Sequence, residues 1–354
     1  MKGYLDYAAT CPKIKFPIDT SKQWRNPNAA YAYEERKVLM DCEERIKAAI
    51  GAKGGHVLYF RCATDALEWL SVVTIAKNPG RWFAHSPYEH DAAVYGSIAT
   101  PDKLDGVDFY CHQFVNQLTG QIHDVEAVKK RMIQYDVEDE DKPFLICDCT
   151  AAIHNISLRA AKVCQYADCI CISGHKLGCP DIAFMWVDDL LFDWLGGGND
   201  VRNQWGLKHG SISVGHVMAL TDAVEWACDD ERIDANEWHY TNLGVRLNTK
   251  LNKAGIKHEW VGDADDQVTA INAIRLPGVN ADALQQYCAS KGVYISVGGS
   301  ACNAAGDFRL LNAYGLSNAK AAEVIRVSFG DETTKNDIDK LISVIKEYKE
   351  RFVV

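Results

Sequence analysis

The chain of 354 residues has no apolar run near the ~20 residues needed to cross a bilayer, so no membrane span is predicted. It also lacks a basic excess. Its 38 Lys and Arg stand against 48 Asp and Glu, a net charge of −10, which argues against general nucleic-acid binding. No secretory-type apolar segment follows the first methionine, and no repeat or low-complexity segment is visible. These absences favour a globular protein without membrane or nucleic-acid partners.

The pattern of a disulfide framework is absent as well. The 13 cysteines are odd in number, scattered, and often placed in apolar runs, which favours free thiols in a reducing cytoplasm. Cys147 and Cys149, like Cys169 and Cys171, would share one face of a strand. Zinc sites prefer roughly two to four residues between ligands on turns. We therefore interpret both pairs as buried structural thiols and expect no metal site.

What is present is an alternation of strand-like and helix-like segments. The predicted strands of the first part are 56–60, 82–86, 108–111 and 144–147, together with the apolar start of the segment 169–176, and helices are predicted at 31–50 and 158–166. This alternation predicts an α/β fold with a mainly parallel sheet. After a long helix at 231–254, the predicted elements are strands 269–276, 293–296 and 324–329, a helix at 281–291, and a final amphipathic helix capped by Thr334 and Asp337. We expect a large domain over 14–233 and a smaller α+β domain over 234–354 that includes residues 1–13.

Two polar residues end neighbouring strands of the expected sheet. Asp148 closes the apolar run 144–147, and Lys176 closes the segment 169–176, whose apolar run ends in small and basic residues. A right-handed strand–helix–strand crossover brings both strand ends to the same sheet edge, where ligands of open α/β sheets bind. A carboxylate for a pyridinium nitrogen and a lysine for an aldehyde are the groups that pyridoxal phosphate requires. The pair therefore predicts a site for that cofactor.

An ordered series of short motifs accompanies this pair. They are Tyr4-Leu5-Asp6-Tyr7-Ala8-Ala9-Thr10 with Pro12, Asn26-Pro27, Ala63-Thr64, Glu89-His90, Val115-Asn116-Gln117 with Gly120, Ser173-Gly174-His175-Lys176, Gly299-Ser300-Ala301-Cys302, and Ile325-Arg326-Val327-Ser328-Phe329-Gly330. In order and spacing, the series resembles the long-loop cysteine desulfurases of the class V aminotransferase family. The resemblance covers nearly the whole chain and implies the aminotransferase type I fold, with a large domain that binds pyridoxal 5′-phosphate.

The resemblance also implies roles for individual residues. Lys176 would hold the cofactor and move protons, Asp148 would keep its ring nitrogen protonated, and His90 would stack on its ring and assist acid–base steps. The residues implied to bind the phosphate are Ala63, Thr64, Ser173 and His175, together with Ser211 from the other subunit of a homodimer. Arg326 and Asn116 would bind the carboxylate of L-cysteine.

Cys302 is the implied nucleophile, and it lies in a segment of small residues, 298–306. Its thiolate would take sulfur from L-cysteine, release L-alanine and pass the sulfur to an acceptor protein, for iron–sulfur clusters or thio-cofactors. The glycines of the segment would permit the motion that this transfer requires.

Departures from the family pattern leave alternatives open. Ala151 stands where the family usually has Gln, and Cys11 and Cys62 stand where Thr and Gly are common. The stretch from Trp205 to Ser211 lacks the family's first arginine and has Lys208 in place of the second. Another reaction of the same cofactor, such as selenocysteine lysis, β-elimination or transamination, therefore stays open, as does a non-enzymatic dimeric scaffold.

Overall fold

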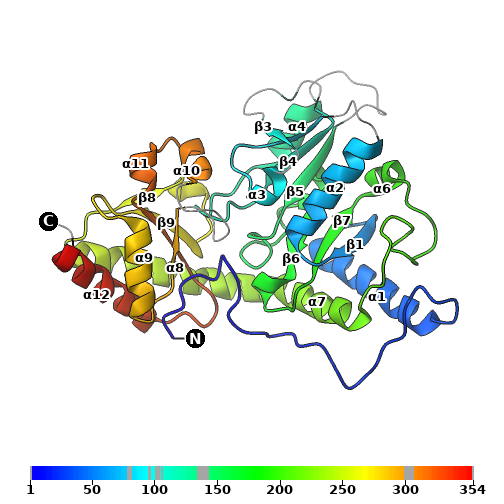
Figure 1. Cartoon of the computed structure of the whole chain (residues 1–354), viewed down its shortest axis with the longest axis horizontal. Helices are drawn as coiled ribbons and strands as arrows, with labels where there is room; N and C mark the ends of the chain where they lie inside the picture. Colours follow the sequence, from blue (N-terminus) through cyan, green and yellow to red (C-terminus); the bar gives the residue numbers. More distant parts are fainter. Residues whose placement is uncertain are drawn as a thin grey trace. The chain divides into compact units, whose positions relative to one another are not determined.

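The computed structural model describes residues 2–77, 82–94, 97–99, 104, 107–133, 143–298 and 307–352. Its contacts divide the chain into two units, shown in Figure 1. The larger unit comprises Lys13–Phe114 and Asp124–Asp230, and the smaller unit comprises Met1–Pro12, Val115–His123 and Glu231–Val354. Compared with the division expected at residue 233, the smaller unit also includes the short segment Val115–His123.

The larger unit is built on a seven-stranded sheet. Its strands are β1 (His56–Phe60), β2 (Phe83–His85), β3 (Ile98–Ala99), β4 (Phe109–Gln113), β5 (Phe144–Asp148), β6 (Cys169–Ser173) and β7 (Ala183–Val187). They are arranged in the order β1-β7-β6-β5-β4-β2-β3. The pairs from β6 to β3 are parallel, whereas β7 lies antiparallel between β1 and β6. The predicted α/β class with a mainly parallel sheet is confirmed.

Helices pack on both faces of this sheet. They are α1 (Tyr33–Ile50), α2 (Ala63–Lys77), α3 (Asp91–Val94), α4 (Val125–Ile133), α5 (Val163–Tyr166), α6 (Asp189–Leu195), α7 (Val214–Ala227) and the 3-10 helix η2 (Gly174–Leu177). One buried cluster joins α2, α3 and α6 to alternate strand residues such as Leu58 and Met185. On the opposite face, Leu39 of α1 lines a small cavity with Val57 and Tyr59 of β1.

The five strands predicted for this unit are all present, and 56–60 has the predicted bounds. The helix predicted over 158–166 is wrong for its first half, since only Val163–Tyr166 is helical. Lys162 has a φ of 54°, in the left-handed region, which interrupts a right-handed helix. The alternation of apolar residues gave no sign of this break. In the described part of the chain, no helix combines the length and apolarity needed to span a membrane.

The smaller unit has an antiparallel sheet of four strands. These are β8 (Glu259–Val261), β9 (Ile271–Arg275), β10 (Ser296–Val297) and β11 (Val324–Ser328), in the order β10-β11-β9-β8. Its helices are α8 (Asp230–Lys253), α9 (Ala281–Ser290), α10 (Arg309–Ala313), α11 (Asn318–Ala321), α12 (Lys335–Phe352) and the 3-10 helix η3 (Ala264–Asp266). The capping pair predicted before α12 is confirmed: Thr334 N donates to Asp337 Oδ2 at 2.9 Å, and Asp337 N donates to Thr334 Oγ1 at 3.4 Å.

The N-terminal segment lies beside β11 in this unit. Tyr4 forms a parallel bridge with Tyr294, and Asp6 forms one with Ser328. β10 begins at Ser296 instead of at the predicted residue 293, and among the described residues Tyr294 pairs only through its isolated bridge to Tyr4. The first residues of the chain thus belong to the framework of the smaller unit.

Gly174 is required by close packing where β6 enters η2. A Cβ at this position would lie 2.7 Å from Ile182 O and 2.9 Å from Leu220 Cδ1. Neither atom has much room to move, because Ile182 O accepts the Gly174 N–H and Leu220 is fully buried. Gly244 of α8, in contrast, has no atom within 4 Å of a Cβ.

We expect Gly174→Ala to lower the free energy of unfolding by about 1–3 kcal/mol, because the added methyl group overpacks the turn. Gly244→Ala is the matched control and should raise it by roughly 0.5–1 kcal/mol, as Gly→Ala does inside a helix. Urea unfolding followed by circular dichroism measures both. Equal midpoints for the wild type and Gly174→Ala would contradict the packing argument.

Candidate active site

Most of the residues predicted to bind a cofactor in the larger unit lie at or shortly after the carboxyl ends of its strands, whereas Ser211 lies in the loop before α7. β1 and β6 are both antiparallel to β7, and both Phe60 and Ser173 pair with Ala183 of that strand. The chain therefore leaves β1 and β6 at the same level, on either side of β7. In the next pair, Asp148 at the end of β5 lies opposite Cys171 of β6. The register thus brings the carboxyl ends of three strands, β1, β5 and β6, to the same side of the sheet.

Asp148 is held by the turn that follows it. The side chain is 6% exposed, and its Oδ1 accepts a hydrogen bond from Thr150 N at 2.9 Å. Thr150 Oγ1 in turn accepts one from Ser173 N at 3.3 Å. The Cys149 N–H also donates to Cys171 O at 3.0 Å. These bonds tie the end of β5 to the end of β6, so the carboxylate is fixed relative to the segment that enters η2.

Lys176 lies three residues beyond the end of its strand, inside η2, and is half-buried. The 3-10 turn ends at Gly178, whose φ of 80° favours glycine. A Cβ there would also lie 2.8 Å from Lys13 O. Glycines with packing constraints therefore flank the turn, at 174 and 178. The lysine projects from a short, closely packed turn and not from an open loop.

His175, next to this lysine, is kept neutral by its surroundings. Burial, and secondly the positive charge of Lys176, lower the pKa of His175 to about 4. A neutral imidazole offers one N–H donor and one acceptor nitrogen. At neutral pH the side chain can therefore donate a hydrogen bond to an anion without carrying a full charge.

The turn from β1 into α2 adds an anion-binding element at the same edge. Ala63 and Thr64 are the first residues of α2, and the first N–H groups of a helix have no acceptor within the helix. The Cys171 thiol donates to Ala63 O at 3.8 Å, which joins this turn to β6. The donors expected around a phosphate thus come from two turns, after β1 and after β6.

Glu89, to which the sequence assigned no role of its own, anchors the turn that carries His90. Its fully buried carboxylate accepts hydrogen bonds through Oε1 from Ser86 Oγ at 2.5 Å and from Gln113 N at 2.7 Å. His90 Nδ1 accepts a bond from Ala92 N at 3.1 Å, so a neutral ring carries its proton on Nε2. The sequence signal that could have indicated this role is an acidic residue four positions after the end of a buried strand, β2.

The loop after α6 closes the free edge of β1, the terminal strand of the sheet. Gln204 Oε1 accepts a bond from Tyr59 N at 2.6 Å, and Lys208 Nζ donates one to Tyr59 O at 3.1 Å. The Lys208 ammonium also lies 3.8 Å from the centre of the Phe60 ring. Burial lowers the pKa of Lys208. Lys208, which replaces an arginine of the family pattern, is thus bound to the strand edge.

A left-handed turn gives this loop its shape. Asn203, Gln204 and Trp205 have φ angles of 53°, 50° and 60°, which are unfavourable for residues with a side chain. Backbone bonds hold the turn: Gly198 N donates to Trp205 O at 2.8 Å, and Lys208 N donates to Asn203 O at 3.1 Å. Ser211, beyond the turn, is exposed.

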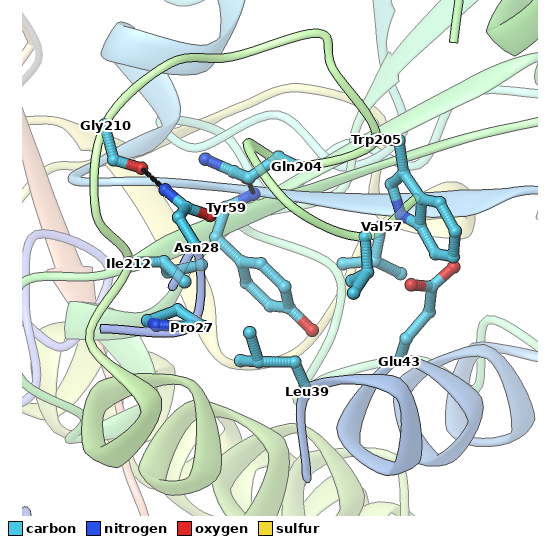
Figure 2. A pocket seen from close by; sticks show the side chains of 11 residues that line it. Pro27, Asn28, Leu39, Glu43, Val57, Tyr59, Gln204, Trp205, Gly210 and Ile212 are labelled. Atoms are coloured by element: carbon cyan, nitrogen blue, oxygen red, sulfur yellow. Dashed lines mark hydrogen bonds between the residues drawn. The ribbon is translucent and has the colours of Figure 1, made fainter. Parts of the chain in front are cut away.

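Figure 2 shows the small cavity beneath this turn, with a volume of about 20 Å³. The Tyr59 ring points into it, and the Tyr59 hydroxyl is buried without a hydrogen-bond partner in the part of the chain described. Burial raises the pKa of Tyr59 well above its usual value. The volume suits about one water molecule. The cavity is therefore too small to be the cofactor site.

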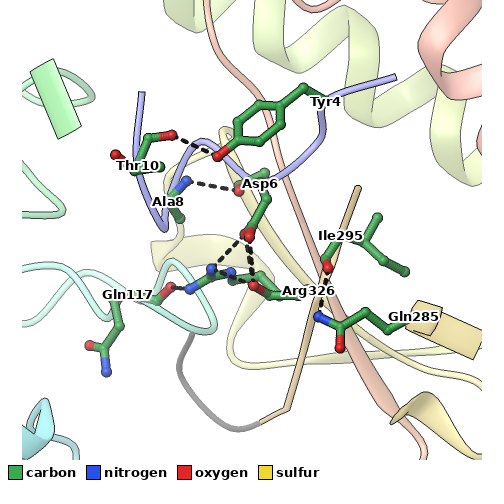
Figure 3. A network of polar contacts seen from close by, with 10 residues as sticks. Tyr4, Asp6, Ala8, Thr10, Gln117, Gln285, Ile295 and Arg326 are labelled. Carbon is green, nitrogen blue, oxygen red and sulfur yellow. Dashed lines mark hydrogen bonds and ion pairs between the residues drawn. The ribbon is translucent and has the colours of Figure 1, made fainter. Parts of the chain in front are cut away.

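Arg326 and Asn116, the predicted substrate residues, both belong to the smaller unit. Arg326 lies in the middle of β11 and is 1% exposed, and its partners include Asp6 and Gln117 (Figure 3). Asn116 is fully buried, and its Oδ1 accepts bonds from Leu118 N at 2.9 Å and Thr119 N at 3.0 Å. The oxygen of Asn116 therefore stabilises its own turn.

Cys302 lies outside the described residues. Each of the other 12 cysteines is a free thiol, and Cys147, Cys149, Cys169 and Cys171 are fully buried. Cys149 Sγ lies 3.7 Å from Cys147 Sγ, and burial raises the pKa of Cys149 well above its usual value. Within the described ranges, no group of three His, Cys, Asp or Glu side chains is placed to hold a metal ion.

Comparisons with known proteins give a consistent result. The family model "Aminotransferase class-V" matches residues 104–341. A putative cysteine desulfurase NifS of Halalkalibacterium halodurans is 23% identical over 98% of this chain and 98% of that protein. A cysteine desulfurase IscS of Shewanella baltica is 30% identical over 97% and 92%. The solved structure of a NifS-like protein, 19% identical, covers 99% of this chain and 100% of its own, with a TM-score of 0.79, and so shares the fold.

The lowered pKa of His175 predicts a dependence of stability on pH in the cofactor-free protein. Unfolded histidine titrates near 6.5, so between about pH 6.5 and 4 the unfolded chain binds a proton that the folded one excludes. The stabilising contribution is present above pH 6.5 and is lost as the pH falls. It changes by up to about 1.4 kcal/mol per pH unit. Urea unfolding at pH 7, 6 and 5 gives the free energy of unfolding at each pH. This free energy should fall less with decreasing pH in His175→Gln than in the wild type. An equal fall in both proteins would contradict the assignment.

Proposed function

Because the chain belongs to the class V aminotransferase family, we propose that it is a cysteine desulfurase. The enzyme uses pyridoxal 5′-phosphate to remove sulfur from L-cysteine, giving L-alanine and a persulfide on Cys302. Family members depend on this cofactor, which supports its assignment here. Relatives named cysteine desulfurase align with 97–98% of the chain, which supports the reaction.

The observation that carries the proposal is the placement of Asp148 and Lys176 after two adjacent parallel strands. A carboxylate and an amine are the protein groups that hold the ring nitrogen and the aldehyde of this cofactor. The N-terminus of α2, together with Ser173 and His175, supplies donors suited to its phosphate. The residues present therefore fit the group. When bound, the cofactor supplies an electron sink that allows bonds of the amino acid to break.

Each residue of the sheet edge has an assigned task. Asp148, fixed by the Thr150 N–H, keeps a proton on the ring nitrogen. Lys176 holds the aldehyde and then moves a proton at the substrate Cα. His90 would stack on the ring face and transfer protons through Nε2, because its Nδ1 accepts the Ala92 N–H.

The phosphate is assigned to backbone N–H groups and side chains of two subunits. Ala63, Thr64, Ser173 and His175 hold it from one subunit through the turns after β1 and β6. Ser211 of the partner subunit completes the set, which requires a homodimer. The exposure of Ser211 supports this assignment, because an exposed hydroxyl is available to a second copy.

The sulfur transfer itself is assigned to Cys302. Its thiolate attacks the sulfur of the substrate, so a sulfur–sulfur bond forms and the carbon–sulfur bond breaks. The electron pair of the broken bond stays with the substrate carbon, which takes a proton and leaves as L-alanine. Sulfur then passes from Cys302 to an acceptor protein.

Arg326 and Asn116 are assigned to the substrate carboxylate. A guanidinium matches a carboxylate through two parallel hydrogen bonds. The Oδ1 of Asn116 is used by its own turn, so this residue has to contribute through its amide nitrogen. A carboxylate site of this kind suits any α-amino acid and does not by itself select cysteine.

A second candidate is another reaction of the same cofactor on an amino acid, such as selenocysteine lysis, β-elimination or transamination. The altered loop favours it, because Lys208 is bound to the edge of β1 where the family pattern has an arginine. Ala151, which replaces the usual Gln, cannot donate a hydrogen bond from its side chain. Comparing products from L-cysteine, L-selenocysteine and cysteine sulfinate separates these reactions. If the purified protein were colourless and contained no cofactor, the alternative of a non-enzymatic dimeric scaffold would be favoured.

We assign the enzyme to the cytoplasm and to sulfur supply for iron–sulfur clusters or thio-cofactors. Free thiols at all 12 described cysteines suit a reducing compartment. A persulfide is a form of sulfur that a second thiol can accept by exchange. The acceptor is therefore expected to present a reactive cysteine of its own.

The reaction is tested with purified protein, L-cysteine and a thiol reductant, which should yield alanine and sulfide in equal amounts. Cys302→Ala should lose at least about 100-fold in sulfide release because the nucleophile is gone. It should still show the visible absorbance of bound cofactor, and Lys176→Ala should not. Equal sulfide release by the wild type and Cys302→Ala would rule out this nucleophile.

Shared sites are tested by mixing two inactive variants. Lys176→Ala removes the lysine, and Ser211→Asp places a carboxylate against the phosphate, so each homodimer should be impaired. In co-expressed 1:1 mixtures, half of the dimers combine both variants and contain one intact site. About a quarter of wild-type activity should therefore return. No gain over the separate variants would contradict a contribution of Ser211 across the dimer.

A further inference from the structure

Arg326 carries a charge that is buried in the smaller unit and needs compensation. It is 1% exposed, and a buried guanidinium is unfavourable unless a carboxylate and hydrogen-bond acceptors surround it. Asp6, from the N-terminal segment, supplies that carboxylate: Arg326 Nη2 donates to Asp6 Oδ1 at 2.7 Å. Figure 3 shows Asp6 and Gln117 beside Arg326.

Ser296 of β10 completes the pair. Its Oγ accepts a bond from Arg326 Nη2 at 2.9 Å and donates to the Asp6 oxygens Oδ1 and Oδ2 at 2.8 and 2.9 Å. Gln117 O accepts from Arg326 Nη1 at 2.9 Å. The Nε–H of Arg326 is buried and has no acceptor among the described residues.

The N–H groups of Arg326 that these partners leave unused, on Nε and Nη1, cannot bind a second carboxylate through two parallel hydrogen bonds. A guanidinium has five N–H groups and two faces on which two of them point in parallel. One face joins Nε to Nη2, and the other joins Nη1 to Nη2. Both Nη2 hydrogens are used, one by Asp6 and one by Ser296. A second carboxylate can therefore bind in a two-bonded manner only if one of these partners leaves.

Asp6 is the partner that can leave. Its side chain is 16% exposed against 1% for Arg326, so a dissolved ligand meets Asp6 first. The backbone on either side of Asp6 is held, since Leu5 N donates to Tyr294 O at 2.9 Å and Ala8 N donates to Ser328 Oγ at 2.9 Å. Rotation of the Asp6 side chain alone would expose the guanidinium while the segment stays in place.

We propose that Asp6 is an internal competitor for the carboxylate site of Arg326, and that a substrate binds there by exchanging its carboxylate for that of Asp6. The inference rests on the proposed function for the identity of the substrate. Asp6 is in this sense a specificity-determining residue. A ligand must bring a negative charge to replace the one it displaces, so neutral amides are rejected.

The exchange is tested by calorimetry in the cofactor-free protein, with L-alanine as the probe and L-alaninamide, which lacks the carboxylate, as the control. Asp6→Asn keeps the size of the side chain but removes the competing charge. It should bind L-alanine about tenfold more tightly than the wild type, the usual difference between a charged and a neutral hydrogen bond. L-Alaninamide should bind no better to the variant.

Two further variants complete the test. Ser328→Ala loosens the same N-terminal segment without touching the charge, and it should bind L-alanine as the wild type does. Ser296→Ala removes the hydroxyl that holds Asp6, and it should strengthen binding in the same direction even if Asp6→Asn folds poorly. Equal affinity of the wild type, Asp6→Asn and Ser296→Ala would overturn the proposal, and so would equal tightening by Ser328→Ala.

The experiment separates the exchange from the desulfurase proposal. If Asp6→Asn tightens L-alanine binding but the loaded enzyme forms no alanine from L-cysteine, the exchange stands and the proposed reaction fails. If alanine forms at the wild-type rate and Asp6→Asn leaves the affinity unchanged, the reaction stands and the exchange fails.

Discussion

The position of β7 between β1 and β6 is the constraint on which the rest of the sheet edge depends. A single buried residue, Ala183, pairs with Phe60 on one side and Ser173 on the other. The turn into α2 and the turn into η2 therefore cannot shift independently of each other. A slip of one residue in either pair would also move the buried side chains of that strand to the wrong face. The core of the unit thus fixes the level at which both turns begin.

The turns themselves are fixed by side chains that bind backbone groups. Asp148 accepts a hydrogen bond from the Thr150 N–H, and Glu89 accepts one from the Gln113 N–H. Gln204 and Lys208 bind the backbone N–H and C=O of Tyr59. Such bonds satisfy buried or edge groups that no neighbouring strand reaches. The bond of Glu89 also restricts His90, the next residue, to a narrow range of positions. Preorganisation here is a consequence of backbone hydrogen bonding.

The sequence predicted the parts of this arrangement that depend on local pattern. The strand 56–60 was correct, and a strand was expected at the start of the segment 169–176, because both apolar runs end abruptly at polar or small residues. The bonds from Gln204 and Lys208 to Tyr59 span 145 and 149 residues, and no periodicity marks them. The helix expected at 158–166 failed because one residue, Lys162, adopts a left-handed conformation. The roles of Asp6 and Asn116 within the smaller unit likewise depend on three-dimensional neighbours.

The same electrostatic rule explains why the proposed carboxylate site at Arg326 already contains a carboxylate of the protein. Arg326 folds into the middle of β11, where its charge would destabilise the unit if it stood alone. Asp6 compensates that charge before any ligand arrives. In the proposed exchange an incoming carboxylate replaces one ion pair with another, so the guanidinium is paired both before and after the ligand binds. The binding free energy of such a ligand is the difference between two similar interactions, which favours moderate affinity and ready release of product.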